Sequence, residues 1–330
     1  MSTELSPQER VWPLLRGFMS TQALFVVASL GIPDELAEGP LPLDELAHRT
    51  GADADTLGRF LRTLASEGVF AEEPRGTFRN TPESELLRSG GGEAWREFTL
   101  FFGSLGYRAF GEALHAAKTG DEPFSRVFGV DFWNRLAENP AESANFNRAM
   151  QAGAEERVER LAGLAWRDGE TVVDVGGGNG TLLIELIRRK PGLKGIVFDL
   201  PEVAQEAKGR VTEAGLEDKI RVAAGSMFDG VPEEGDAYVL AVVLHDWNDE
   251  AAAKILHQLR ETMPDESRLV ILDAILESES EDDNRRWLDL LMLVLNGGRE
   301  RTEQDWNELL GDAGFRVERF GENLIEAVPA

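Results

Sequence analysis

The stretch TVVDVGGGNG at residues 171–180 decides the fold. Its first half has the β-branched residues of a buried strand, and its glycines form a tight turn before a helix that opens at Thr181. In an α/β sheet a ligand binds outside the carboxyl end of such a strand, where glycines let the backbone approach it closely. We therefore expect a ligand site at this loop.

The spacing of the glycines distinguishes between classes of ligand. A dinucleotide fingerprint needs G-x-G-x-x-G/A, but Gly176-x-Gly178 is followed three residues later by Thr181. The spacing is instead G-x-G-x-G, with a carboxylate at Asp174 inside the strand. Because no pyrophosphate is called for, the loop suits a nucleoside that carries a charged amino-acid tail.

Short apolar runs and helical stretches alternate after residue 170. The strand candidates are Thr171–Val175, Gly195–Phe198, Ile220–Ala223, Ala237–Val243 and Leu269–Asp273. The helix candidates are Leu182–Arg189, Pro201–Ala214, Glu250–Thr262 and Asn284–Leu295. This alternation predicts an α/β domain with a parallel sheet covered on both faces.

The N-terminal third has a different pattern. A helix in residues 11–37 is stopped by the sequence Gly-Ile-Pro at 31–33, and an amphipathic helix follows at 55–67. Two short strands at 68–70 and 76–79 complete a winged-helix pattern. Such domains often bind DNA, but the second helix balances its arginines with acidic residues, so a structural or dimerisation role is favoured.

Residues 93–166, between these two regions, are rich in helix formers and aromatic side chains. Helix packing explains most of them, although a pocket for a flat organic molecule needs the same lining. We assign 1–92 to a winged-helix-like domain, 93–166 to a helical linker and pocket region, and 167–330 to the ligand-binding α/β domain.

Composition excludes several functions. Sixty acidic residues against 34 basic ones give a net charge of −26, which disfavours nucleic acid and anionic membranes as partners. No apolar run approaches the length of about 18 residues that a membrane helix needs, and the start lacks a secretory signal. The absence of cysteine excludes thiolate metal sites and fits a cytoplasmic enzyme. The acidity fits a high-salt habitat and simple solubility equally well.

Asp199 is a candidate for ribose binding. It ends the second strand candidate, 19 residues after Gly180, where a carboxylate can accept both hydrogen bonds of a ribose diol. The alternative is a cap for the helix that begins near Pro201. The glycine loop upstream favours ribose contact.

His245 is a candidate general base. It follows the strand candidate 237–243, so it lies on the ligand side of the sheet, and histidine is the natural base near neutral pH. A lone histidine beside a strand is more often structural. Asp273 at the next strand end and Glu300 in a later loop could orient its imidazole ring.

The motifs VVDVGGGNGTLL, FDLPEV, GSMFDGVP, VLHDWNDE and LMLVLNGGRERTEQDWNELLGDAGF together resemble those of plant caffeate/flavonoid-type and hydroxyindole-type O-methyltransferases and their bacterial relatives in secondary metabolism. The likeness covers residues 170–316, and the start of the chain with FNRAM at 146–150 extends it. It implies a Rossmann-like class I methyltransferase domain, an N-terminal winged-helix dimerisation domain, a homodimer and S-adenosylmethionine as cofactor.

The resemblance also implies roles for single residues. His245 matches the family's general base, and Asp273 and Glu300 match the acids beside it. The residues that fall at the family's cofactor contacts are Gly176, Gly178, Asp199, Leu200, Met227, Phe228 and Trp247. Asp174 in the strand and Ser226 before Met227 are added as cofactor-binding candidates. Those that fall in the acceptor pocket are Met150, Met292 and Asn296, with core packing as the alternative for the two methionines.

Two positions depart from the family pattern. Ser226 stands where the family often has an aspartate for the adenine amino group, so adenine contact at this position is open. Ala241 stands where the plant enzymes carry a lysine.

The expected reaction is methyl transfer to a hydroxyl of a small, aromatic secondary metabolite, with no metal, because no His/carboxylate cluster has ligand spacing. The alternatives are a cofactor-binding relative that hydroxylates or decarboxylates, a methyltransferase acting on nitrogen or carbon, and a ligand-sensing regulator.

Overall fold

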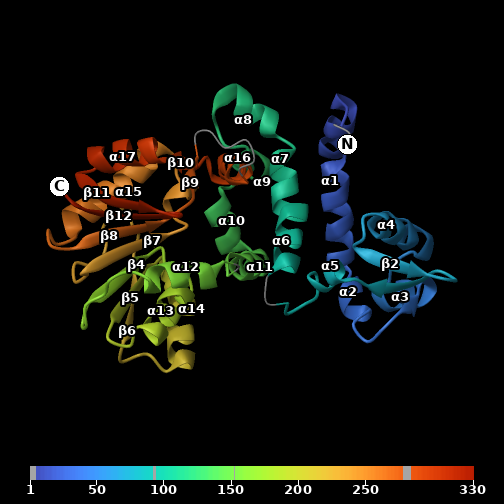
Figure 1. Cartoon of the computed structure of the whole chain (residues 1–330), viewed down its shortest axis with the longest axis horizontal. Coiled ribbons are helices and arrows are strands. Elements are labelled where there is room, and N and C mark those ends of the chain that lie inside the picture. The colour runs from blue at the N-terminus through green and yellow to red at the C-terminus, as the bar shows by residue number, and fades with distance from the viewer. Residues whose placement is uncertain (1–4, 92–93, 152, 278–283) are drawn as a thin grey trace. The chain divides into compact units, whose positions relative to one another are not determined.

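The computed structural model describes residues 5–91, 94–151, 153–277 and 284–330 (Figure 1). The chain forms two compact units: residues 1–111 with 138–152, and residues 112–137 with 153–330. The helical region that the sequence suggested at 93–166 is therefore divided between the two units. Each unit is described by itself.

The second unit is built on a seven-stranded sheet with the order β11-β12-β8-β7-β4-β5-β6. Its strands are β4 (Thr171–Val175), β5 (Lys194–Asp199), β6 (Ile220–Ala224), β7 (Ala237–Ala241), β8 (Arg268–Leu272), β11 (Phe315–Gly321) and β12 (Leu324–Pro329). Strands β4 to β8 are parallel. Strand β4 lies between β5 and β7, so the strand order reverses at β4, and ligands bind at such a point.

The prediction of an entirely parallel sheet is wrong at one edge. Strand β12 pairs antiparallel with β8, and β11 pairs antiparallel with β12. Only Glu322 and Asn323 connect β11 to β12, and a connection this short can join only antiparallel strands. The hairpin turn uses Asn323 at a φ of 50°.

The main helices of this unit are α12 (Ala154–Ala162), α13 (Thr181–Arg189), α14 (Pro201–Ala214), α15 (Asp249–Thr262), α16 (Arg285–Asn296) and α17 (Glu303–Asp312). Shorter elements are α8 (Ala113–Thr119), α9 (Phe124–Phe128), η2 (Leu244–Asp246), β9 (Ile275–Leu276) and β10 (Arg301–Thr302). Helix α10 (Phe132–Glu138) ends at the boundary between the two units.

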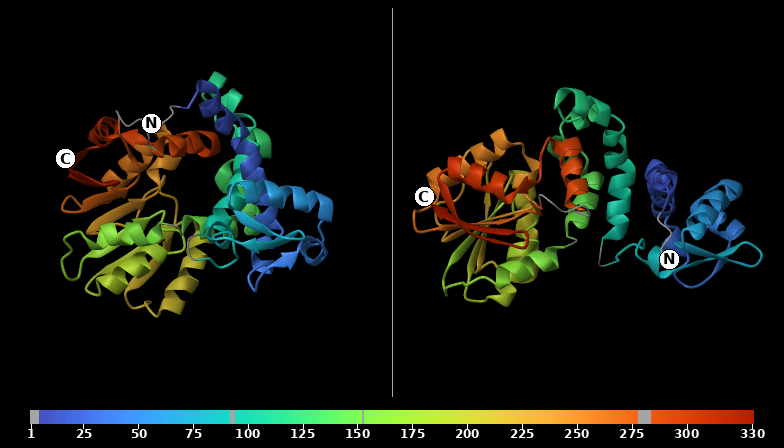
Figure 2. Two further views of the ribbon diagram at one scale, coloured as in Figure 1. Left: turned by 45° about the vertical axis from the view of Figure 1, so that its right-hand side comes forward. Right: turned by 45° about the horizontal axis from the view of Figure 1, so that its top comes forward.

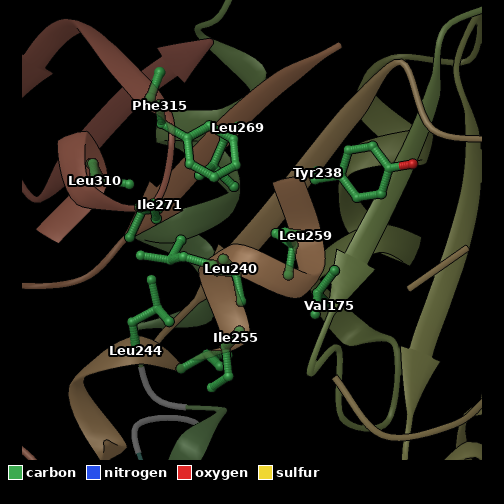
Figure 3. Close-up of a cluster of buried hydrophobic side chains, with 14 of the residues drawn as sticks. Val175, Tyr238, Leu240, Leu244, Ile255, Leu259, Leu269, Ile271, Leu310 and Phe315 are labelled. Atoms are coloured by element: carbon green, nitrogen blue, oxygen red, sulfur yellow. The ribbon is translucent and has the colours of Figure 1, made fainter. Parts of the chain in front are cut away.

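Alternating side chains of β7 create one hydrophobic core on each face of the sheet. Tyr238 and Leu240 join the cluster formed with α15 and α17 (Figure 3). Val239 joins the cluster formed with α12, α13 and α14 on the other face. Burial of both faces explains why the strands appear in the sequence as nearly continuous apolar runs.

The first unit contains the helices and hairpin that the sequence predicts. Its helices are α1 (Pro7–Ser29), α2 (Ile32–Glu35), α3 (Leu43–Thr50), α4 (Ala54–Ser66), α5 (Pro82–Glu85), α6 (Trp95–Phe101), η1 (Phe102–Gly106), α7 (Tyr107–Phe110) and α11 (Pro140–Met150). Its strands β1 (Leu41–Pro42), β2 (Phe70–Glu73) and β3 (Thr77–Asn80) pair antiparallel in the order β1-β3-β2 (Figure 2).

Helix α1 differs from its predicted form. It begins after Ser6, whose side chain and backbone form a capping box with Glu9, and it ends at Ser29. By length and composition α1 could cross a membrane, which the sequence reading did not anticipate. One such helix is weak evidence, because a core helix of a soluble protein meets the same criterion.

Replacing Leu240 with alanine is expected to lower the free energy of unfolding by about 2–5 kcal/mol, because it leaves a cavity in the core beside α15. Leu114→Ala on α8 is the control, since that side chain is 67% exposed and its loss should cost within about 0.5 kcal/mol. Urea unfolding measures both. Equal losses would contradict the assigned packing.

Candidate active site

The glycine loop after β4 comes close to the neighbouring strand ends. Gly176 has a φ of +72°, and a Cβ there would lie 2.9 Å from a methyl group of Val243. The same Cβ would lie 3.5 Å from the Met227 methyl group. The position therefore requires glycine for both conformation and space.

Asp199 anchors this loop. Its Oδ2 accepts a hydrogen bond from the Gly178 amide at 2.8 Å, and its Oδ1 accepts one from the Leu200 amide at 2.7 Å. Burial raises the pKa of Asp199, and the two amide bonds oppose that rise. The N-cap of α14 is Leu200 and no side chain caps that helix, so capping does not explain Asp199. A carboxylate has about four acceptor sites, which leaves capacity for a diol.

Asp174 is a buried carboxyl group beside the same loop. It is 2% exposed, and within the described residues its Oδ2 has no hydrogen-bond partner. Burial, reinforced by the charge of Asp199, raises its pKa to about 7. A buried polar atom without a partner is costly, so this oxygen suits a ligand that donates a hydrogen bond or carries positive charge.

Apolar side chains extend the site in the segments that follow β6 and β7. The rings of Phe228 and Trp247 pack edge to face with centroids 4.9 Å apart. Together with Met227 they lie against the core on the α15 face. The hydroxyl oxygen of Ser226 accepts the Phe228 amide at 3.2 Å, so one of its lone pairs serves the loop itself.

His245 lies in the turn η2 directly after β7. Strand β7 ends two residues earlier than predicted because Val242 takes a left-handed conformation with φ +59°. The imidazole is 4% exposed, and its Nδ1 lies 2.6 Å from Glu300 Oε1. On the other side of the ring, Nε2 lies 3.8 Å from Asp246 Oδ1, beyond hydrogen-bond range.

Asp273 hydrogen-bonds to the backbone and acts on the imidazole through its charge. It is 2% exposed, and its Oδ1 accepts the Val243 amide at 3.2 Å. Burial raises its pKa, while the charge of His245 and amide bonds from Val243 and His245 oppose the rise. Of the two acids proposed beside the histidine, Glu300 therefore contacts the ring directly, and Asp273 holds the turn that carries it.

The charges around His245 favour its protonated form. Burial alone lowers the pKa of the imidazole, but Asp246, Glu300 and Asp273 outweigh burial and raise it to about 10. Burial raises the pKa of Asp246 to about 7. The acidic neighbours thus favour the protonated imidazole, while burial raises the pKa of Glu300 and the charge and hydrogen bond of His245 oppose that rise.

Sequence reasoning missed Asp246. Its Oδ1 accepts a hydrogen bond from Asn296 Nδ2 at 2.9 Å, which links the turn after β7 to the end of α16. Met292, 6% exposed, lies one helical turn before Asn296 on α16. Met150 ends α11 in the first unit. The position of Asp246 directly after His245 was the available signal, but spacing cannot show that its carboxyl lies near Nε2.

Comparison with known proteins adds the family. Residues 107–316 match the O-methyltransferase domain, and residues 12–90 match the O-methyltransferase dimerisation domain. The chain belongs to the O-methyltransferase family. It is an S-adenosylmethionine-dependent enzyme with a class I methyltransferase fold and an N-terminal helical dimerisation domain.

Individual relatives cover nearly the whole chain. A phenazine O-methyltransferase of Lysobacter antibioticus is 40% identical over 96% of this chain and 94% of its own length. An 8-amino-8-demethylriboflavin N,N-dimethyltransferase of Streptomyces davaonensis is 34% identical over 89% of this chain and 86% of its own length. An O-methyltransferase from neocarzinostatin biosynthesis, solved with S-adenosylmethionine and 2-hydroxy-5-methyl naphthoic acid, has a TM-score of 0.89 at 30% identity. The two structures align over the full length of both chains.

Replacing Gly298 with alanine is expected to lower turnover by about tenfold or more, because a Cβ there would lie 2.1 Å from the His245 carbonyl oxygen and displace the turn. Gly311→Ala in α17 is the control, since its Cβ would meet nothing within 4 Å. Steady-state kinetics on both variants measures the effect. Full activity of Gly298→Ala would show that the position of the turn is unimportant.

Proposed function

We propose that this enzyme transfers a methyl group to a hydroxyl of a small, planar aromatic metabolite, with His245 as the general base. The observation that carries the proposal is the contact of 2.6 Å between His245 Nδ1 and Glu300 Oε1. It fixes the ring and leaves Nε2 to take the acceptor proton. When bound, S-adenosylmethionine supplies the electrophilic sulfonium methyl group.

The cofactor would be held at the carboxyl ends of β4 and β5. Asp199 has acceptor capacity for the ribose hydroxyls, and the buried Oδ2 of Asp174 suits the ammonium group of the methionyl tail. Met227, Phe228 and Trp247 provide apolar surface for a flat base. Binding the ammonium group would satisfy a buried oxygen that has no hydrogen-bond partner among the described residues.

Charge near the imidazole makes His245 a strong proton acceptor once it is neutral. Positive charge brought near these residues by a bound cofactor would lower the pKa of the imidazole, because like charges disfavour its protonated form. His245 then takes the hydroxyl proton at Nε2, and Glu300 stabilises the resulting imidazolium. Burial of the cluster excludes water and strengthens these interactions.

The relatives support an aromatic acceptor. The name of the Lysobacter enzyme gives a phenazine as its acceptor, and the neocarzinostatin-pathway structure contains a hydroxynaphthoic acid. Both are fused, planar ring systems with few hydrogen-bonding groups. Met292 and Asn296 on α16 would contact such a ring in this chain.

A homodimer is the proposed assembly. Helix α1 belongs to the region that matches the dimerisation domain, and it carries several large apolar side chains that are at least half exposed in the single chain. These are Val11, Trp12, Leu14, Leu15, Phe18 and Met19. Exposed apolar surface of this kind marks a protein interface.

Methyl transfer to nitrogen is the rival function, because one relative is an N,N-dimethyltransferase. A neutral amine attacks through its lone pair and needs no base before attack, whereas a hydroxyl must lose its proton. The importance of His245 therefore separates the two functions.

His245→Ala is expected to lower turnover of a phenolic acceptor by about 10²- to 10⁴-fold, the usual contribution of a general base. Affinity for S-adenosylhomocysteine should stay within about twofold, because the ring is assigned to the acceptor. Mass spectrometry of the methylated product and calorimetric titration measure these quantities. Equal loss of both would assign His245 a structural role, and retained turnover would favour an amine acceptor.

Turnover should also depend on pH in a specific way. The neutral imidazole is the active base, and its pKa in the free enzyme is raised from 6.5 to about 10, so kcat/KM under limiting cofactor should still rise above pH 8. Glu300→Gln removes one of the charges that raise this pKa and should move the rise to lower pH. A plateau already reached at pH 7, with a midpoint near the ordinary 6.5, would contradict the assignment.

A further inference from the structure

Arg301 is a fully buried cation next to η2, the turn that carries His245. It is 0% exposed and lies in β10, one residue after Glu300. Its guanidinium group lies over the ring of Trp306, with 5.3 Å from Cζ to the ring centroid. Taking such a group out of water is costly unless its donors are well satisfied.

The guanidinium donors are directed at the backbone of the turn. Nη1 donates to the Leu244 carbonyl oxygen at 3.0 Å, and Nη2 donates to the Trp247 carbonyl oxygen at 2.9 Å. These two carbonyls belong to residues on either side of the His245–Asp246 pair. The planar fork of arginine can reach both at once, whereas a lysine ammonium group is a single point donor.

Asp249 completes the contacts of Arg301 from the far end of the turn. Its Oδ1 accepts from Arg301 Nε at 3.0 Å, and its Oδ2 accepts from Arg299 Nη1 at 2.7 Å. The Asp249 side chain is 55% exposed, so this ion pair reaches the surface. The contacts of Arg301 with the two carbonyls are the buried ones.

Asp273 holds the same turn from its amide side. Its carboxylate accepts the amide of Val243, while Arg301 donates to carbonyls. The Arg299 amide adds a hydrogen bond of 2.9 Å to the His245 carbonyl oxygen. The backbone amides and carbonyls of the turn are thus hydrogen-bonded from two sides. Val242, just before the turn, has a left-handed conformation that is unfavourable for a β-branched side chain.

We propose that Arg301 is a positioning residue for the methyl transfer: it fixes the backbone of residues 244–247 so that His245 stays aligned with both Glu300 and the acceptor. This inference rests on the proposed role of His245 as the base. The contacts that the structure describes for Arg301 are with backbone carbonyls, Asp249 and Trp306, and none of them is with the imidazole ring. The effect of Arg301 is transmitted through the carbonyls of Leu244 and Trp247.

The test is Arg301→Lys, which keeps the positive charge and removes the planar guanidinium group that reaches both carbonyls. We expect kcat to fall about tenfold to a hundredfold, since small misplacements of a catalytic group have effects of that size. Affinity for S-adenosylhomocysteine and the KM of the acceptor should change little. The rise of kcat/KM with pH should move toward the ordinary value for histidine, because a looser turn weakens the contact with Glu300.

Arg268→Lys is the matched control. Arg268 is also largely buried, pairs with Glu170 and lies over a tryptophan ring, that of Trp166, but it stands at the first residue of β8, far along that strand from Asp273. It should lose thermal stability as Arg301→Lys does and keep the wild-type kcat and pH profile. A merely structural role for Arg301 would make the two variants alike, which would overturn the proposal.

Two further variants keep the outcomes distinct. If Arg301→Lys does not fold, Asp249→Asn replaces it as the test. This variant weakens the ion pair with Arg301 but keeps the guanidinium group, so kcat should fall by a smaller factor. His245→Ala in the same assay separates the two hypotheses. If His245→Ala is active, the proposed function fails. If it is inactive while Arg301→Lys and Asp249→Asn both keep the wild-type kcat, the positioning role alone is wrong.

Discussion

The hydrogen bond between buried His245 and Glu300 is the interaction on which the account of this site depends. It joins the turn after β7 to the segment before β10, two parts of the chain 55 residues apart. Around it the sheet end places Asp246 and Asp273, so the imidazole lies among three carboxyl groups shielded from water. Holding that much acid in a buried space is unfavourable unless positive charge is present, and the protonated ring and Arg301 supply it.

Much of the fold could be predicted because local signals agree with the tertiary structure. The bounds of the parallel strands β4 to β8 were predicted to within two residues. The signals were the glycine loop after β4, the continuous apolar runs of strands buried on both faces, and the caps of the helices between them. The antiparallel hairpin β11–β12 was missed, because residues 315–329 lack the alternation with helices that marks the other strands. The end of β7 was misplaced because the left-handed turn at Val242 leaves no sign in a β-branched sequence.

The site was predictable in its residue types and less so in its contacts. His245, Glu300 and Asp199 were predicted as site residues from their places at strand ends and in motifs. The structure gives each a hydrogen-bond partner, and their roles stay predictions. The division of labour between Asp273 and Glu300 depends on where side chains point, which spacing does not encode. Arg301 escaped notice because a surface-type residue in a charged loop normally indicates exposure, and only the packed structure shows it to be buried.

The central claim is that His245 is held as an imidazolium paired with Glu300 in the free enzyme. Nitrogen-15 NMR of the histidine ring across pH, assigned with His245→Ala, tests this claim without any acceptor. The His245 resonances are expected to remain those of the protonated ring well above pH 7, since the pKa of the imidazole is raised to about 10. A neutral ring at pH 7 that titrates near 6.5 would contradict the claim and the electrostatic argument built on it.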